Sequence, residues 1–149
     1  ALPFPTEHTD TLTLFEDPFY LATLPNSRLA LSQKLKTKDL QGAEMLLLEE
    51  GHCLRDHALE ACKLREKDVT VPYQATSLTT IVQMVANGIG TTLLPKMATD
   101  AGIAEGTDLV LRPFDEPDVG RQIGLMWRKK TPRKHEFNLL GAFIQSCLS

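Results

Sequence analysis

The feature that most restricts the fold of this chain is an uninterrupted apolar run, Met45-Leu46-Leu47-Leu48, which ends just before Gly51. A strand with one face in water alternates apolar and polar residues, whereas consecutive apolar residues predict a strand buried on both faces. Such strands occur in α/β sheets that helices cover on each side. We therefore expect an interior strand here, followed by a turn at Gly51 and a helix.

The rest of the chain alternates between strand and helix patterns. An amphipathic helix is predicted by the apolar spacing of Leu78, Ile81, Val82 and Val85, and it should end near Asn87-Gly88. The alternation predicts an α/β sheet with parallel members. In the helix expected after Pro132, Cys147 should lie on a buried apolar face. Further strands are expected at 12–15, 19–24, 69–74, 91–94, 109–111 and 123–127, and a short helix at 96–101.

Two cysteines nine residues apart, Cys53 and Cys62, follow the Gly51 turn. If residues 53–66 formed one continuous helix, this separation would be about 13.5 Å of rise, with the two sulfurs on opposite faces. A disulfide requires Cα atoms roughly 4.4–6.8 Å apart. The thiols therefore cannot be joined while the helix exists, and the segment is a candidate two-state element that oxidation would switch.

The surroundings of the two cysteines differ. Cys53 should begin the helix with His52 and Arg55 beside it, and a helix N-terminus with nearby cations favours a thiolate. Asp56 and two glutamates oppose this effect, and we expect the amides and Arg55 to prevail. Cys62 adjoins an apolar stripe of the same helix, so we expect it to be buried, less reactive and suited to a resolving role.

Composition excludes several classes of function. The chain has 149 residues, the size of one domain, and its net charge of −3 leaves no broad nucleic-acid footprint. Its three cysteines come without a secretory signal or an apolar run of membrane length. These features favour a reducing cytoplasmic location without membrane contact, where a disulfide is typically transient or sensing.

Several readings of these residues stay open. Cys53 and Cys62 could be inert structural thiols. Cys53, His57 and His52 could begin a zinc site, but Cys62 on the far side spoils a four-ligand set within one helix, so no metal or other cofactor is expected. Thr76 and Ser77 could bind an anion at a helix N-terminus inside a cleft, or could simply cap that helix.

Four motifs stand out: residues 51–56 with Cys62, Ala75-Thr76-Ser77-Leu78, residues 85–95, and Ile123-Gly124-Leu125 before a basic turn. Together they resemble the regulatory domains of LysR-type transcriptional regulators. The last two motifs are similar to features shared by many LysR-type domains. The run Gly-His-Cys-Leu-Arg-Asp with a second cysteine nine residues on is much narrower, and it is similar to the hydrogen-peroxide-sensing members.

This resemblance implies a periplasmic-binding-protein-like α/β fold that comprises the second regulatory subdomain and part of the first. Residues 1–16 would end the first subdomain and form a crossover. Residues 17–121 would be the second subdomain with the redox cysteines, and residues 122–149 a strand and helix returning to the first. The DNA-binding domain of such regulators is expected to lie outside this chain.

The resemblance also implies a chemistry. Cys53 would be the peroxidatic cysteine and Cys62 the resolving one, with His52, Arg55 and Asp56 supporting the thiolate and the peroxide. Peroxide would convert Cys53 to a sulfenic acid, and a Cys53–Cys62 disulfide would then refold the segment between them.

The partners implied are hydrogen peroxide, promoter DNA through the N-terminal domain, RNA polymerase and a glutaredoxin- or thioredoxin-type reductant. The full-length protein is expected to be a homodimer or homotetramer. A regulator, not an enzyme, is therefore the leading prediction. Two alternatives are a thiol peroxidase using the same cysteines, and a LysR-type domain that binds a small effector in a cleft near Thr76 and Ser77.

Overall fold

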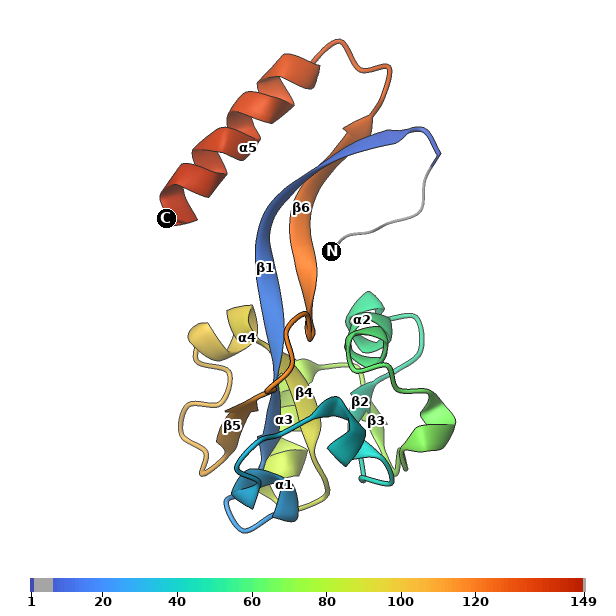
Figure 1. Cartoon of the computed structure of the whole chain (residues 1–149), viewed down its shortest axis with the longest axis vertical. Helices are drawn as coiled ribbons and strands as arrows, with labels where there is room; N and C mark the ends of the chain where they lie inside the picture. The colour runs from blue at the N-terminus through green and yellow to red at the C-terminus, as the bar shows by residue number, and fades with distance from the viewer. Residues whose placement is uncertain (2–6, 149) are drawn as a thin grey trace. The chain divides into compact units, whose positions relative to one another are not determined.

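The computed structural model describes residue 1 and residues 7–148, so the segment expected at 1–16 falls partly outside the described residues. The chain divides into two compact units: unit 1 contains residues 1–17 and 121–149, and unit 2 contains residues 18–120. The α-helices and strands are labelled in Figure 1. In order they are β1 (Thr9–Thr23), α1 (Arg28–Leu31), the 3-10 turn η1 (Thr37–Leu40), β2 (Leu47–Leu48), α2 (Cys53–Ala61), the 3-10 turn η2 (Glu66–Asp68), β3 (Gln74–Ala75), α3 (Leu78–Ala86), β4 (Thr92–Pro95), α4 (Lys96–Asp100), β5 (Val110–Pro113), β6 (Gly120–Arg128) and α5 (Lys134–Leu148).

Unit 2 combines antiparallel and parallel strand pairs. The end of β1 pairs antiparallel with both β4 and β5, so that Leu21 lies opposite Leu93 and Arg112. β2 and β3 pair in parallel, with Leu48 opposite Ala75. Just before β2, isolated parallel bridges join Glu44 to Thr70 and Met45 to Thr91, the residue that precedes β4. The predicted α/β sheet with parallel members is therefore confirmed.

The apolar run that leads into β2 lies in the interior of unit 2. Met45 and Leu46 are both 0% exposed, and Leu47 and Leu48 are also buried. Helix α3 covers this run with Ile81 and Val85, and its remaining buried residue, Val82, packs on Ala22 and Leu94. Both the interior strand and the amphipathic helix are confirmed, because in each case apolar periodicity alone specifies the buried positions.

Three strand predictions were wrong in extent. The segments 12–15 and 19–24 belong to one strand, β1, which runs through Pro18. The ladder with β4 begins at Phe19, so the missing amide hydrogen of Pro18 removes none of these hydrogen bonds. The strand expected at 69–74 is reduced to a bridge at Thr70 and the short β3, because Pro72 lies between them.

Unit 1 contains the first part of β1, together with β6 and α5. Gly141 is buried in α5, and a Cβ atom there would lie 2.2 Å from Cδ2 of Leu12, so helix and strand pack closely. This contact turns Cys147 toward solvent, and the prediction of a buried Cys147 was wrong. Among the described residues, no helix is long and apolar enough to cross a membrane.

Candidate functional site

The site begins at the carboxyl ends of β2 and β3. Because the two strands run in parallel, the segments that follow them leave from the same edge (Figure 1). The amide of Glu49 donates to the carbonyl of Ala75 at 3.1 Å and joins the two segments there. The start of α2 and the predicted Thr76–Ser77 cap of α3 are therefore brought to one edge of the sheet.

The N-terminal turn of α2 carries the first thiol. Gly51 has a φ of +89°, which lets the chain turn sharply into the helix. His52 is the N-cap residue, and Cys53 is the first residue of α2 and is exposed. His52 and Asp56 are exposed on the same turn. A small solute can therefore reach the Cys53 sulfur without any opening of the helix.

The C-terminal end of α2 comes earlier than in the continuous helix considered above for residues 53–66. The helix ends at Ala61 instead of continuing to residue 66. Lys63 has a left-handed φ of +52°, and its amide donates to the Glu60 carbonyl at 2.9 Å. The amide of Leu64 donates to the Leu59 carbonyl at 2.9 Å, which completes a Schellman cap. A left-handed lysine gives no sequence signal for this stop, since glycine is the usual residue there.

The second thiol lies at this end, fully inside unit 2. Cys62 is 2% exposed and belongs to the same apolar cluster as Ala58 and Leu64. Burial, and then the nearby carboxylate of Glu116, raise the pKa of Cys62 to about 12. Glu116 is held in place because it accepts hydrogen bonds from the amide and the hydroxyl of Thr37, at 2.6 and 3.0 Å. The predicted burial of Cys62 is confirmed, and the thiol is protonated at neutral pH.

The shorter helix does not remove the geometric conflict between the thiols. The amide of Cys62 still donates to the carbonyl of Ala58 at 3.2 Å, so residue 62 continues the helical backbone as its C-cap. Nine helical steps from Cys53 amount to about 13.5 Å of rise, twice the longest Cα separation of a disulfide. A bond between these sulfurs requires part of α2 to unwind.

Arg55 occupies a buried position between α2 and its surroundings. Its side chain is 3% exposed, and Nη1 donates to the carbonyl of Leu48 at 2.8 Å. Nη2 forms an ion pair with the carboxylate of Glu66, the first residue of η2. Within the described residues, these hydrogen bonds go to Leu48 and Glu66 and not to the sulfur of Cys53. A role for Arg55 in stabilising the thiolate therefore stays a prediction.

Among the described residues of unit 2, Cys53 lines neither the cavity beneath α2 nor the cavity beside Thr23 and Thr91. The cavity beneath α2, bordered by Leu48, Arg55 and Leu78, has a volume of about 10 Å³. That is the space of one water molecule, too small for a larger solute. Within the described residues, no three His, Cys, Asp or Glu side chains are grouped as they would be around a metal ion.

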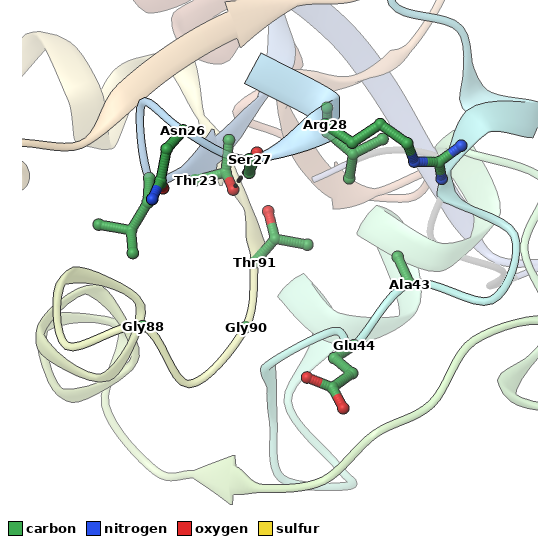
Figure 2. Close-up of a pocket in the computed structure, with 11 residues that line it drawn as sticks. Thr23, Asn26, Ser27, Arg28, Ala43, Glu44, Gly88, Gly90 and Thr91 are labelled. Carbon is green, nitrogen blue, oxygen red and sulfur yellow. Dashed lines mark hydrogen bonds between the residues drawn. The ribbon is translucent and has the colours of Figure 1, made fainter. Parts of the chain in front are cut away.

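The second cavity, of about 290 Å³, was not found from the sequence and is shown in Figure 2. Its polar wall includes Thr23, Ser27 and Thr91, whose hydroxyls are engaged: Thr23 donates to Ser27 at 2.9 Å, and Thr91 to the Ala22 carbonyl at 2.6 Å. The charged ends of the lining residues Arg28 and Glu44 point away from each other (Figure 2). Among the described residues that line this pocket, charged groups do not converge as they do in a typical ligand site.

Comparison with known proteins identifies the fold. The family described as the LysR substrate binding domain matches residues 1–148. The chain belongs to this family. Among solved structures, the reduced regulatory domain of OxyR2 from Vibrio vulnificus is 38% identical with a TM-score of 0.83, over 97% of this chain and 68% of that one. The predicted periplasmic-binding-protein-like α/β regulatory fold is confirmed.

Relatives of this LysR substrate-binding domain carry two kinds of name. The regulator EstR of Acinetobacter baylyi is 35% identical over 94% of this chain and 46% of its own length. A probable hydrogen peroxide-inducible genes activator of Mycobacterium avium is 35% identical over 100% of this chain and 48% of its own length. The chain thus spans about half the length of the curated relatives it matches. Family membership establishes an OxyR-like LysR regulatory domain, and the roles of individual residues remain to be proposed.

Proposed function

We propose that this chain is the redox-sensing regulatory domain of a transcription factor that hydrogen peroxide activates. The observation that carries the proposal is the contrast between the thiols at the two ends of α2: Cys53 is exposed and Cys62 is 2% exposed. The solved OxyR2 domain and the peroxide-inducible activator among the relatives support the same reading. Unit 2 would be one regulatory subdomain, and unit 1 part of the other.

The chemistry balances with one peroxide and two thiols. The Cys53 thiolate attacks one peroxide oxygen, the O–O bond breaks, and the hydroxide that leaves takes a proton to become water. Cys62 then attacks the sulfenic sulfur, the S–O bond breaks, and a second water leaves as the disulfide forms. Two electrons pass from the thiols to the peroxide. His52 and Arg55 would stabilise the thiolate or position the peroxide, and Asp56, whose charge opposes the thiolate, would act on the peroxide alone.

The consequence of this reaction would be a change of shape. Because α2 must unwind to join its ends, oxidation refolds the segment between Cys53 and Cys62. In the full-length protein this change would reach promoter DNA through the DNA-binding domain outside this chain, and RNA polymerase through that complex, within a homodimer or homotetramer. A glutaredoxin- or thioredoxin-type protein would restore the thiols.

The test is peroxide treatment of the chain in a Cys147→Ser background, since the exposed Cys147 could otherwise form mixed disulfides. We expect mass spectrometry to find one Cys53–Cys62 bond, and hydrogen exchange over residues 52–63 to accelerate. Cys53→Ser should abolish both signals, and Cys62→Ser should stop at the sulfenic acid. Two free thiols after peroxide treatment, or a bond with unchanged exchange, would refute the proposal.

A second candidate is a LysR-type domain that responds to a small anionic effector, with the cysteines incidental. It is favoured by the relative EstR, whose name carries no reference to peroxide, and by the exposed Thr76 and Ser77 beside the Cys53 turn. Under this reading, Cys53→Ser leaves the response of the regulator unchanged. A thiol peroxidase would instead consume peroxide in many turnovers with a thiol reductant.

A further inference from the structure

The ion pair between Arg55 and Glu66 connects the two ends of the segment that carries Cys62. Arg55 lies in the first turn of α2, and Glu66 lies beyond the C-terminal cap, in η2. A second ion pair fixes the start of η2, because Asp68 accepts hydrogen bonds from the amide and Nε of Arg65 at 2.9 and 3.0 Å. The carboxylate of Glu66 is therefore presented to Arg55 by an ordered turn.

A buried guanidinium depends on its partners. Arg55 is 3% exposed, and a charge so enclosed is destabilising unless anions or carbonyls compensate it. Here the carbonyl of Leu48 supplies one acceptor, and the carboxylate of Glu66 supplies the opposite charge. These contacts tie the first turn of α2 both to β2 and to η2.

Disulfide formation displaces the two parts of the chain that this ion pair joins. The Cα atoms of Cys53 and Cys62 must approach by about 7 Å, from the rise of an intact helix to the limit of a disulfide. Arg55 lies two residues after Cys53, and Glu66 lies four residues after Cys62. We therefore expect the approach of the two cysteines to break or lengthen the contact between Arg55 and Glu66.

We propose that Glu66 is a positioning residue that acts through Arg55 to stabilise the reduced arrangement of α2, and thereby sets how readily the Cys53–Cys62 disulfide forms. The inference rests on the proposed redox chemistry of these cysteines. Under this proposal, the reduction potential of the Cys53–Cys62 disulfide depends in part on Arg55 and Glu66, two side chains that do not react. Removing the carboxylate of Glu66 should make the disulfide easier to form.

The test measures the disulfide equilibrium in the Cys147→Ser chain against reduced and oxidised glutathione. Replacing Glu66 by glutamine should raise the equilibrium constant for disulfide formation about threefold to fivefold, the upper range for a pair with one half-exposed partner. For this two-electron couple a fivefold change is about 20 mV, toward a more negative potential. Glu66→Ala, which also removes the hydrogen-bond acceptor, should produce a larger shift in the same direction.

The matched control is Glu60→Gln, which removes an exposed carboxylate from α2 itself and should leave the equilibrium at the wild-type value. Raising the salt concentration to 1 M, where the Debye length is about 3 Å, should shift the wild type toward the Glu66→Gln value and leave that variant nearly unchanged. Because Arg55 is 3% exposed, salt screens the pair only in part, so the expected result is a partial shift in the wild type that Glu66→Gln lacks.

The outcomes separate the two proposals. A Cys53–Cys62 disulfide with the same potential in the wild type, Glu66→Gln and Glu66→Ala overturns the role of Glu66 and leaves the proposed function intact. Absence of the disulfide from every variant overturns both. A further arm compares thermal unfolding, since loss of the pair should lower the Tm of the reduced form and leave the disulfide form unaffected.

Discussion

The two ends of α2 differ in nearly every property that governs a thiol. At the N-terminal end, Cys53 is exposed on the first turn beside the exposed His52. At the C-terminal end, Cys62 is enclosed by apolar side chains, and its pKa is raised to about 12. One short helix thus carries a thiol that solutes reach freely and a thiol that is protonated and inaccessible. A reagent can therefore reach the Cys62 sulfur only when the C-terminal end of α2 opens, whatever the intrinsic reactivity of the thiol.

The largest expected effect is a difference in alkylation rate. Under reducing conditions Cys53 and Cys147 should react rapidly with iodoacetamide, because both are exposed. Cys62 should react at least about 100-fold more slowly, since labelling requires a local opening that costs on the order of 3 kcal/mol. Peptide mapping over a time course measures the three rates in one sample, with Cys147 as the internal control. Labelling of Cys62 as fast as Cys147 would contradict the comparison.

The next effect is a loss of stability at alkaline pH. The Cys62 thiol ionises near its ordinary value of 9.0 when the chain is unfolded and at about 12 when it is folded. Below pH 9 both states keep the proton, so the stability is fully present. Above pH 9 only the folded state keeps it, and the free energy of unfolding should fall by about 1.4 kcal/mol per pH unit until the folded thiol ionises.

Urea unfolding under reducing conditions at pH 7.5 and pH 10 measures this change. Other groups also titrate in the range, so the informative quantity is the difference between the wild type and Cys62→Ala. The variant should be less stable at both pH values because of the cavity it leaves, but its stability should fall less between them. Equal losses in the two proteins would mean that Cys62 is not the group responsible.

The sequence predicted those parts of the site that depend on local periodicity. The apolar run ending at Leu48 and the helix beginning at Leu78 were found because each pattern specifies its own burial. The burial of Cys62 followed from the apolar stripe of α2 for the same reason. The position of Cys53 at a helix start followed from the Gly51 turn.

The rest depends on contacts between residues that no local pattern relates. Glu66 reaches Arg55 only because the chain reverses after Ala61, and that reversal depends on a lysine in a left-handed conformation. Burial of Cys147 was expected from helical spacing, but the close packing of Gly141 on Leu12 turns α5 so that Cys147 faces solvent. In both cases the tertiary contact, and not the propensity of the residue, decides the outcome.

The smallest expected effect concerns the cap that holds Cys62 in place. Lys63 adopts a φ of +52°, which costs a residue with a Cβ atom about 1 kcal/mol and costs glycine almost nothing. Lys63→Gly should therefore raise the free energy of unfolding of the reduced chain by about 0.5–1 kcal/mol, measured in urea. It should also slow alkylation of Cys62, because a better cap makes the C-terminal end of α2 open less often.

The matched control for this cap is Glu60→Gly, inside α2 and three residues before Lys63. There the backbone is helical, so glycine should lower stability by about 1 kcal/mol, the opposite sign. Opposite effects of one substitution at two neighbouring positions separate the left-handed cap from the general flexibility of glycine. If both variants lose stability equally, Lys63 does not hold the left-handed conformation, and the enclosure of Cys62 must depend on its apolar neighbours alone.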